Sequence, residues 1–599
     1  MPKNKNVSIK YTSRDFESIK EDLVQYAKRY YPNSYKDFSA ASFGSLMFDT
    51  VAYASDILSY YLDYHVNESF IDTSLEFDNV RKHAKSLGYK FAGTPSSFGT
   101  VSLFILCPSN SDGTAPDNSY LPILKQGTTF STPDGGNFIL TEDVDFSSNT
   151  SDFVAARFSE STGVTTYFAV RNYAQVQSGV LNIATADLTN SSFEKFRKVR
   201  VGGPNISEII SIVDTEGNKY YEVDHLSQEV VMIDTTNKNA SVDGVRSILK
   251  PFSTTRRYVL EQDDTGTFLQ FGFGSEDVDD GGLTDPSRVV LKMQGKNYIS
   301  SKSFDPTKLI STNKLGISPH NTTLTIIYRT NSPEASNVGA NQINTVSNAR
   351  FIFKDLSVLL VSQRAFVQSS LEVNNENPIT SLGVDISVEE LKQRAKSSFA
   401  MQGRAVTKTD YESLVYNLPP KFGSVTRANI VNDPSSSNRK LSLYLISTDN
   451  NGNLSQTNQI TKNNIKNWIS QYKSLNDQIE IFDPKIINFE LEFTVSVDRR
   501  FSQQIVLRKC ISEVKKLLAD KFYIGEPLYL NRIYSILNRV DGVDDVRKVV
   551  AVNKTGGVYS SISLDMSKIV SKDGTFYQTP ENCILELKYP EENIKGIAK

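Results

Sequence analysis

The sequence has little cysteine and little histidine. Its 599 residues include three cysteines, Cys107, Cys510 and Cys583, which lie far apart in the chain. So sparse and odd a set excludes a disulfide framework and a CxxC-type metal site. The four histidines are scattered too, and none stands at the H-x-x-x-H spacing that puts two imidazoles on one helix face. We therefore expect reduced, mostly buried thiols, a cytoplasmic environment and no metal site.

The chain also lacks an excess of charge of either sign. Lysine and arginine number 65 against 68 aspartates and glutamates, which gives a net charge of −3. A nearly neutral chain has no global attraction to nucleic acid or to an anionic membrane. No apolar run approaches the roughly 20 residues that span a bilayer, and the polar N-terminus has no apolar core of a secretory signal. The expected partners are other proteins, with no nucleic acid and no membrane.

Known catalytic and cofactor-binding motifs are missing. There is no Walker-type phosphate loop and no G-x-S-x-G nucleophile elbow. Gly272-Phe273-Gly274 begins like a dinucleotide loop, but Asp277 replaces the last glycine and would repel a pyrophosphate. A calcium loop that starts at Asp277 fails as well, because Arg288 stands where a bidentate glutamate is required. We expect no catalytic residue, no cofactor and no metal.

What the chain has is enough apolar sequence for several cores. Hydrophobic residues make up 39% and aromatic residues 10%, and the length suggests roughly four domains. Residues 1–92 have helical periodicity. The first helix is predicted to start at a cap provided by Thr12 or Ser13 and to end near Pro32. A third helix follows a T-x-x-E capping box made by Thr73 and Glu76 and stops at Gly88.

The second helix, predicted over about residues 44–64, has apolar residues on two sides. One row contains Met47, Val51, Ala54, Leu58, Tyr61 and Leu62. The other row, rotated around the helix, contains Leu46, Tyr53, Ile57, Tyr60 and Tyr64. Such a helix is either central in a bundle or shared with a partner chain, and the sequence leaves both interpretations open. The residues of the second set are the candidates for a protein interface.

The remaining sequence predicts an α+β multidomain protein. Residues 93–345 alternate between short strand patterns and glycine-containing turns, which predicts a β-rich middle region. Helices return and alternate with strands in residues 346–482 and 483–599, which predicts two small α+β domains in series at the C-terminal end. The predicted layout is therefore a helical region over 1–92, the β-rich region and these two domains. Gly93-Thr94-Pro95 and the segment 374–379 are candidate hinges.

Several stretches carry a resemblance to one family. They are YTSRDFESIKEDLVQY (11–26), the segment from FSAASFGS to LGYK (38–90), ILKQGTTFSTPDGGNFILTEDVDF (123–146), FLQFGFGS with ASNVGANQI, the segment from SVEELKQ to RANIV (387–431), and GEPLYLNRIYSILNRVDGVDDVRKVV (525–550). Together they resemble the wedge protein of contractile-tailed bacteriophage baseplates, a member of the baseplate J-like family. Many relatives have FGDG where this chain has FGFG at 271–274.

The resemblance implies a structural role and no enzymatic activity. Such proteins form the inner ring of the baseplate around the central hub and spike, and they rearrange when the sheath contracts. Two copies pair and join a second wedge protein through helices. It follows that the partners would be a second copy of this chain, other wedge proteins and the hub or spike. The location would be the virion tail baseplate, assembled in the host cytoplasm.

Three alternatives remain open at this point. A tail-associated hydrolase would need carboxylates in the β-rich region, and Asp263, Asp264 and Asp277 are the candidates. A receptor-binding adhesin would be built on the same region, although adhesins are often β-rich throughout. The third alternative is the equivalent baseplate part of a phage-like contractile injection system.

Overall fold

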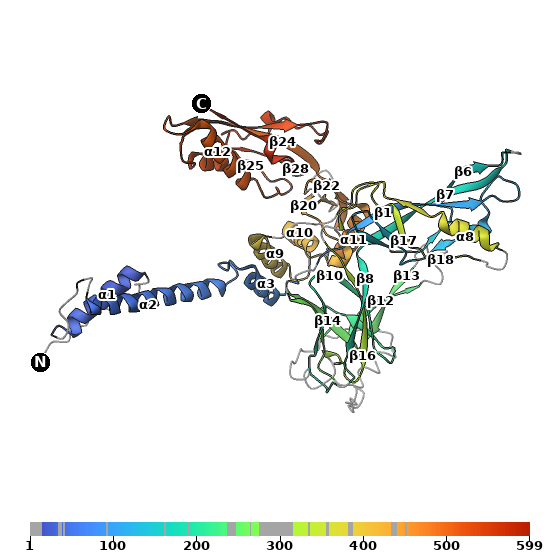
Figure 1. The fold of residues 1–599 in the computed structure, drawn as a ribbon, viewed down its shortest axis with the longest axis horizontal. Coiled ribbons are helices and arrows are strands. Elements are labelled where there is room, and N and C mark those ends of the chain that lie inside the picture. Colours follow the sequence, from blue (N-terminus) through green and yellow to red (C-terminus); the bar gives the residue numbers. More distant parts are fainter. Residues whose placement is uncertain are drawn as a thin grey trace. The chain divides into compact units, whose positions relative to one another are not determined.

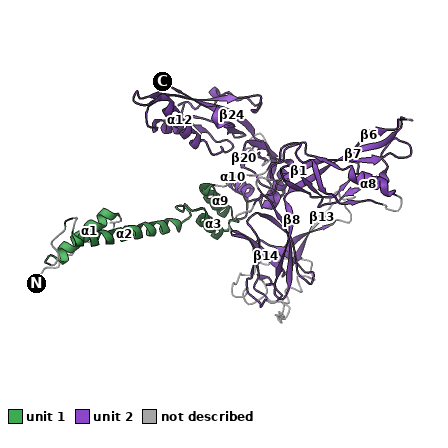
Figure 2. Cartoon of the chain, in the orientation of Figure 1, with its two compact units in different colours: residues 1–91, 385–402 green, residues 92–384, 403–599 purple. Residues whose placement is uncertain are grey.

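The structure is a computed structural model of residues 1–599. It describes residues 15–33, 39, 42–90, 94–160, 163–189, 191–236, 247–263, 265–274, 315–332, 336–354, 359–380, 387–432, 440–449 and 452–599. The chain divides into two compact units, residues 1–91 with 385–402 and residues 92–384 with 403–599 (Figure 2). Helices and strands are both abundant, so the chain is a mixed α+β protein of more than one unit (Figure 1). Each unit is described on its own below.

The first unit is helical. Its helices are α1 (Phe16–Tyr30), α2 (Phe43–Glu68), α3 (Phe77–Ser86) and α9 (Val388–Met401). The carboxylate of Asp15 caps α1 by accepting a 3.3 Å hydrogen bond from the Ser18 amide, whereas the predicted caps Thr12 and Ser13 lie outside the described residues. The helix ends at Tyr30, one residue before the position that Pro32 restricts.

A small core joins α3 to α9. It contains Val80, Ala84, Tyr89, Leu391 and Ala395. The Ser387 hydroxyl caps α9 by accepting a 3.2 Å hydrogen bond from the Glu390 amide, as the S-x-x-E spacing of these two residues predicts. The sequence pattern places this helix in the domain 346–482. In the structure α9 belongs to the first unit, because it buries its apolar face against α3, which lies about 300 residues earlier in the sequence.

The second unit begins with a seven-stranded sheet of order β17-β3-β4-β7-β1-β19, in which β6 also pairs with β7. Its strands are β1 (Phe98–Pro108), β3 (Thr129–Ser131), β4 (Asn137–Leu140), β6 (Asp152–Phe158), β7 (Thr165–Ser178), β17 (Thr345–Asn348) and β19 (Glu372–Asn374). A three-stranded sheet contains β2 (Ile123–Leu124), β5 (Val144–Asp145) and β18 (Phe351–Ile352). Helix α8 (Val361–Ser369) and the short helix η1 (Asn118–Tyr120) belong to the same region.

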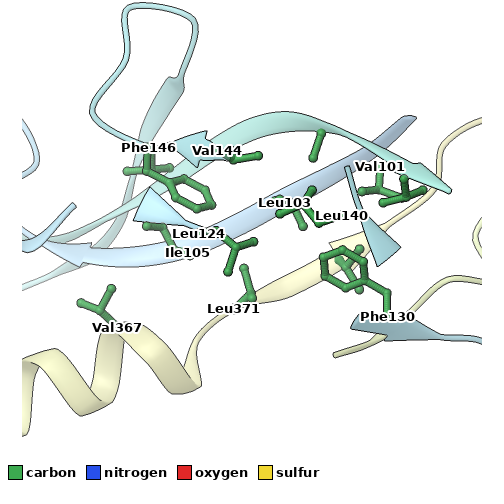
Figure 3. Close-up of a cluster of buried hydrophobic side chains, with 14 of the residues drawn as sticks. Val101, Leu103, Ile105, Leu124, Phe130, Leu140, Val144, Phe146, Val367 and Leu371 are labelled. Atoms are coloured by element: carbon green, nitrogen blue, oxygen red, sulfur yellow. The ribbon is translucent and has the colours of Figure 1, made fainter. Parts of the chain in front are cut away.

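The core of this first sheet mixes distant parts of the sequence. Leu103 and Ile105 of β1 lie in one cluster with Val367 of α8 and with Leu371 (Figure 3). In the sheet itself, Ser102 is paired with Asn374. Strands β17, β18 and β19 and helix α8 therefore belong with β1 and β7. The predicted boundary at 345/346 falls inside this sheet, because the sequence pattern assigns the segment after 345 to the following domain.

A second seven-stranded sheet lies between β7 and β17 in the sequence, in the order β8-β16-β10-β11-β14-β15-β9. Its strands are β8 (Val180–Asp187), β9 (Lys198–Gly202), β10 (Ile206–Val213), β11 (Lys219–Glu222), β14 (Arg257–Asp263), β15 (Gly266–Phe271) and β16 (Thr323–Thr330). A separate hairpin contains β12 (Val230–Thr236) and β13 (Ser247–Ser253). The β-rich region is thus one sheet inserted into another.

Buried amides fix both ends of this insertion. The Asn331 side-chain amide donates to the Pro95 carbonyl at 2.9 Å and to the Ser178 hydroxyl at 2.8 Å.

The predicted hinge at 374–379 contains the fully buried Asn375, whose Oδ1 accepts from two backbone amides of 342–343 and whose Nδ2 donates to two carbonyls. Because this network holds the segment, it opposes a hinge at 374–379. Of the other predicted hinge, Gly93 lies outside the described residues.

Residues 403–599 contain two further sheets, each with helices. The first has β20 (Arg427–Asn432), β21 (Lys440–Thr448), β22 (Leu454–Gln456) and β23 (Gln478–Phe482), with α10 (Lys408–Tyr416), η3 (Pro420–Phe422) and α11 (Gln459–Ser470). The second has β24 (Lys485–Val497), β26 (Val543–Lys554), β28 (Cys583–Glu586) and β29 (Ile594–Ala598), with α12 (Gln503–Leu517), α13 (Leu530–Asn538) and α14 (Pro590–Asn593). Strands β25 (Leu528–Tyr529) and β27 (Phe576–Tyr577) pair separately, and η4 spans Met566–Lys568. The predicted division at 482/483 falls between β23 and β24.

Candidate protein interface

Helix α2, which carries all five predicted interface residues, is long and well capped. The Ser42 hydroxyl accepts a 3.1 Å hydrogen bond from the Ser45 amide and satisfies one of the free amides at the helix start. No proline interrupts the 26 residues that follow. The helix extends four residues beyond its predicted end at Tyr64. Local sequence thus favours one continuous rod, which places side chains at regular intervals along its length.

Helix α1 covers one side of α2. The contact is made by small side chains, since Ala27 of α1 and Ser45 and Ala52 of α2 are buried, Ala52 completely so (0% exposed). At its edge, the Lys20 ammonium lies 2.6 Å from the Asp49 carboxylate. Among the described helices and strands, α1 makes the extended contact with α2, and Figure 1 shows it beside the N-terminal part of that helix. The described chain therefore builds no bundle around α2.

The predicted interface residues are mostly exposed to solvent. We call Leu46, Tyr53, Ile57, Tyr60 and Tyr64 the Tyr60 row. Leu46, Tyr53, Ile57 and Tyr60 expose 59%, 61%, 36% and 68% of their surface, respectively, whereas Tyr64 is half-buried. Partial burial and the nearby carboxylates of Glu76 and Glu68 raise the pKa of Tyr64. The structure therefore gives four of these five side chains a free apolar surface.

The other apolar row is exposed as well. We call Met47, Val51, Ala54, Leu58, Tyr61 and Leu62 the Leu58 row, and its larger side chains expose between 46% and 67% of their surface. Val66 and Phe70, just beyond it, are equally exposed. Scattered apolar residues are normal on a protein surface, but two continuous rows on one helix are not. The sequence left two interpretations of this helix open, a central place in a bundle or contact with a partner chain. Burial within this chain does not match the exposure of α2 in the described residues.

The turn between α2 and α3 is held by Glu68, which sequence reasoning missed. Its carboxylate accepts hydrogen bonds from the Leu75 amide (2.8 Å), the Ser74 hydroxyl (2.7 Å) and the Asn79 side-chain amide (2.9 Å). These hydrogen bonds, first among them the one from Leu75, lower the pKa of Glu68 to about 2. The imidazole Nε2 of His83 lies 2.8 Å from the Glu68 carbonyl oxygen.

Glu68 replaces the predicted capping box. Thr73 does not cap α3, because its hydroxyl donates to the Asn67 carbonyl instead. Glu76 is the N-cap residue but makes no side-chain cap bond. A carboxylate near the first turn of a helix also interacts favourably with the helix dipole. No signal of local spacing could have indicated Glu68, which lies nine residues before the start of α3. Gly88, by contrast, has the positive φ of 85° expected after the helix.

The carboxylates proposed for a hydrolase show no catalytic arrangement in the described residues. Asp263 closes a turn, where its Oδ1 accepts from the amides of Thr265 (2.9 Å) and Gly266 (3.1 Å). The hydrogen bond from the Thr265 hydroxyl is the main cause of its lowered pKa. Asp264 and Asp277 lie outside the described residues, as does Arg288. Elsewhere in the described chain, no three histidine, cysteine or acidic side chains gather as a metal would require.

The FGFG stretch and the three cysteines have structural explanations. Gly272 and Gly274 follow β15 in a close backbone contact, in which the Gly274 amide donates to the Gly316 carbonyl at 2.9 Å. A Cβ atom on Gly272 would lie 2.2 Å from that oxygen, so this glycine serves packing between two backbones. All three cysteines are buried and free, and burial raises the pKa of the Cys107 thiol to about 12. No helix within the described ranges has the length and apolarity needed to cross a membrane.

Comparison with known proteins gives structural likenesses only. No family model matches the sequence, and no curated protein matches it. The chain is similar to a protein in the cryo-electron microscopy structure of the anti-feeding prophage (AFP) baseplate, with 11% identity, a TM-score of 0.26 and coverage of 97% of this chain and 100% of that chain. It is similar to a chain of the type VI secretion system TssK-TssF-TssG baseplate subcomplex, with 8% identity, a TM-score of 0.23 and coverage of 73% and 96%. Both TM-scores are low, so neither likeness carries an argument about this chain.

Proposed function

We propose that this chain is a structural subunit of a contractile-tail baseplate. As a wedge component it would belong to the inner ring around the central hub or spike and rearrange when the sheath contracts. It has no enzymatic role in this proposal. Its partners are a second copy of the chain and other wedge proteins, and its location is the tail baseplate of a virion or of a phage-like injection particle, assembled in the host cytoplasm.

The observation that carries the proposal is the pair of exposed apolar rows on α2. A helix with exposed tyrosines, leucines and methionine on two sides, beyond the side that α1 covers, buries them only when other chains cover both sides. An assembly subunit that contacts more than one neighbour needs such a helix, whereas a hydrolase or an adhesin does not. The type of assembly comes from the sequence resemblance to baseplate wedge proteins over residues 11–90, 387–431 and 525–550.

Immunogold labelling of purified particles tests this function. Antibodies raised against residues 483–599, a segment outside the helical unit, should label the baseplate end of the tail and leave the shaft and capsid unlabelled. Label on the shaft or capsid, or absence of the chain from particles, would contradict the proposal. Sedimentation of the purified chain then addresses pairing. A stable dimer has twice the 66.9 kDa mass of one chain, whereas a trimer would favour the adhesin instead.

A further inference from the structure

The last two α+β domains of the chain have separate sheets. We call residues 403–482 the penultimate domain and residues 485–599 the last domain. In the described residues no strand of one sheet pairs with a strand of the other, and the core of the last domain is built from its own side chains. Two residues, Asp483 and Pro484, connect β23 to β24. Domains on so short a linker can turn against each other but cannot separate widely.

The linker is fixed on either side of Pro484. The Asp483 carboxylate lies 2.7 Å from the Lys462 ammonium of α11, which ties it to the penultimate domain. The Lys485 amide donates to the Asn582 carbonyl at 2.9 Å, which ties the next residue to the last domain. Proline itself has a fixed φ. A turn between the domains is therefore confined to the few backbone torsions around Pro484, and a hinge requires no more than a few such residues.

The contact between the two domains has a small apolar centre. It contains three buried isoleucines, Ile446 of β21, Ile524 and Ile584 of β28, with partly buried side chains around them. The core of the last domain is far larger. Relative motion is the usual behaviour of neighbouring domains unless their contact is large and apolar. This centre is small, so the polar contacts around it decide which position the domains take.

A carboxylate joins the two domains beside this centre. Oε1 of Glu586, at the end of β28, accepts a 2.6 Å hydrogen bond from the amide of Leu454 at the start of β22. Its Oε2 accepts a 2.7 Å hydrogen bond from the side-chain amide of Asn488 in β24. Asn488 is buried, and its Oδ1 accepts from the Ser560 amide, so its own orientation is fixed. The last domain thus aims one oriented carboxylate at a backbone amide of the penultimate domain.

Charged groups surround the centre on other sides as well. The Lys521 ammonium donates to the Gly452 carbonyl, and the Arg427 guanidinium lies 4.3 Å from the ring centroid of Tyr523. Burial raises the pKa of the Glu586 carboxyl and lowers the pKa of the Lys521 ammonium, so the contact disfavours the charged form of both groups. Because the burial of charge costs free energy, such contacts define one position without adding much net stability. A domain contact of this kind can open as well as close.

We propose that the penultimate and last domains turn about Pro484, and that the Glu586 carboxylate is the latch that holds them in the position seen in the structure. The inference rests on the proposed function, because it names the joint at which a subunit that rearranges on sheath contraction changes shape. A turn here releases the latch and a small apolar centre. A turn at 374–379 would instead break the buried Asn375 network.

Spin labels on the two domains test the joint in the purified full-length chain. Leu475→Cys and Asp573→Cys place one label on each domain, since both side chains are exposed and the native cysteines are buried. Labelled chain is diluted with unlabelled chain, so that pulsed electron paramagnetic resonance reads distances within one chain. We expect one narrow distance distribution. Glu586→Ala should add a second distance and shift the ratio of the two populations at least about tenfold, because the Leu454 amide loses a charged acceptor only in the latched position. An unchanged distribution would overturn the inference.

Two further variants isolate the latch. Glu581→Ala is the matched control, because this side chain is exposed and only the backbone carbonyl of the residue accepts a bond across the contact, from Asn429 at 2.9 Å. It should leave the distance unchanged. Glu586→Gln should release the latch, since its NH2 group faces a donor whichever way it turns. Adding Asn488→Asp supplies an acceptor for that group and should restore the single distance. Glu586→Gln that keeps the single distance, or that Asn488→Asp does not rescue, would contradict the latch.

The same pair of labels separates this inference from the proposed function. In purified particles the distance between the labels should differ before and after sheath contraction. Particles that contain the labelled chain and keep one distance through contraction would overturn the joint and leave the baseplate role intact. Absence of the chain from the particles would instead overturn the proposed function.

Discussion

Tyr60 offers the sharpest test of an interface on α2. Its side chain is 68% exposed, which leaves roughly 140 Å² of a surface of about 200 Å² free to be buried by a partner. At about 25 cal/mol per Å², covering that surface stabilises an assembly by about 3.5 kcal/mol. Tyr60→Glu should therefore weaken association by at least about 100-fold. The same substitution should change the free energy of unfolding of the isolated chain by less than about 0.5 kcal/mol, because the side chain is exposed there.

Two further substitutions on the same helix control for charge and for folding. Ser59→Glu adds the same charge beside Tyr60 but outside both apolar rows, and we expect normal assembly. Ala52→Glu puts the charge into the completely buried contact with α1 and should abolish the helical pair. Circular dichroism measures folding, and co-sedimentation with particles measures assembly. Tyr60→Glu that unfolds like Ala52→Glu, or that assembles normally, would refute the reasoning.

Three other predictions concern single residues. Asn375→Ala should cost about 3 kcal/mol of stability in chemical denaturation, because buried amides and carbonyls lose their partner; an unchanged midpoint would contradict the described network. Gly272→Ala should destabilise the inserted sheet by about 1–3 kcal/mol, because its Cβ would meet the Gly316 carbonyl at 2.2 Å. The control is Gly135→Ala, which has open space at the Cβ but a positive φ of 86°. It measures the cost of backbone strain without a clash. The pKa of Glu68 in the folded chain, about 2, is below the ordinary carboxyl value of 4.5. Its contribution to stability is therefore present above pH 4.5 and is lost as the pH falls toward 2, so hydrogen exchange at the Leu75 amide should become faster in acid. Glu68→Gln should remove this acid dependence, and a variant that keeps it would show that another group is responsible.

Local pattern was sufficient to predict the helices of the first unit. The spacing of apolar residues located α2 to within one residue at its start. These signals depend only on neighbours within one or two turns. The composition of α2 also indicated its two apolar rows. Whether those rows were covered by this chain or left free was not a local question, and the structure was needed to answer it.

Errors arose where distant residues decide the arrangement. Glu68 displaced the Thr73–Glu76 box because the turn after α2 brings its carboxylate to the start of α3. Helix α9 packs on Val80 and Ala84, and Ser102 pairs with Asn374 in the first sheet. The last two contacts join segments hundreds of residues apart, so the pattern along the chain assigns these segments to different domains. The nested arrangement of the two β-sheets was missed for the same reason.

Thiol labelling at position 60 tests the central claim, that other chains cover the exposed rows of α2, most directly. Tyr60→Cys provides one accessible thiol, because burial raises the pKa values of Cys107, Cys510 and Cys583 and keeps them unreactive at neutral pH. A maleimide should label the free variant rapidly and label it in intact particles at least about tenfold more slowly, with full labelling after the particles are denatured. Equal rates for the free chain and the particle would contradict the claim that α2 is an assembly interface.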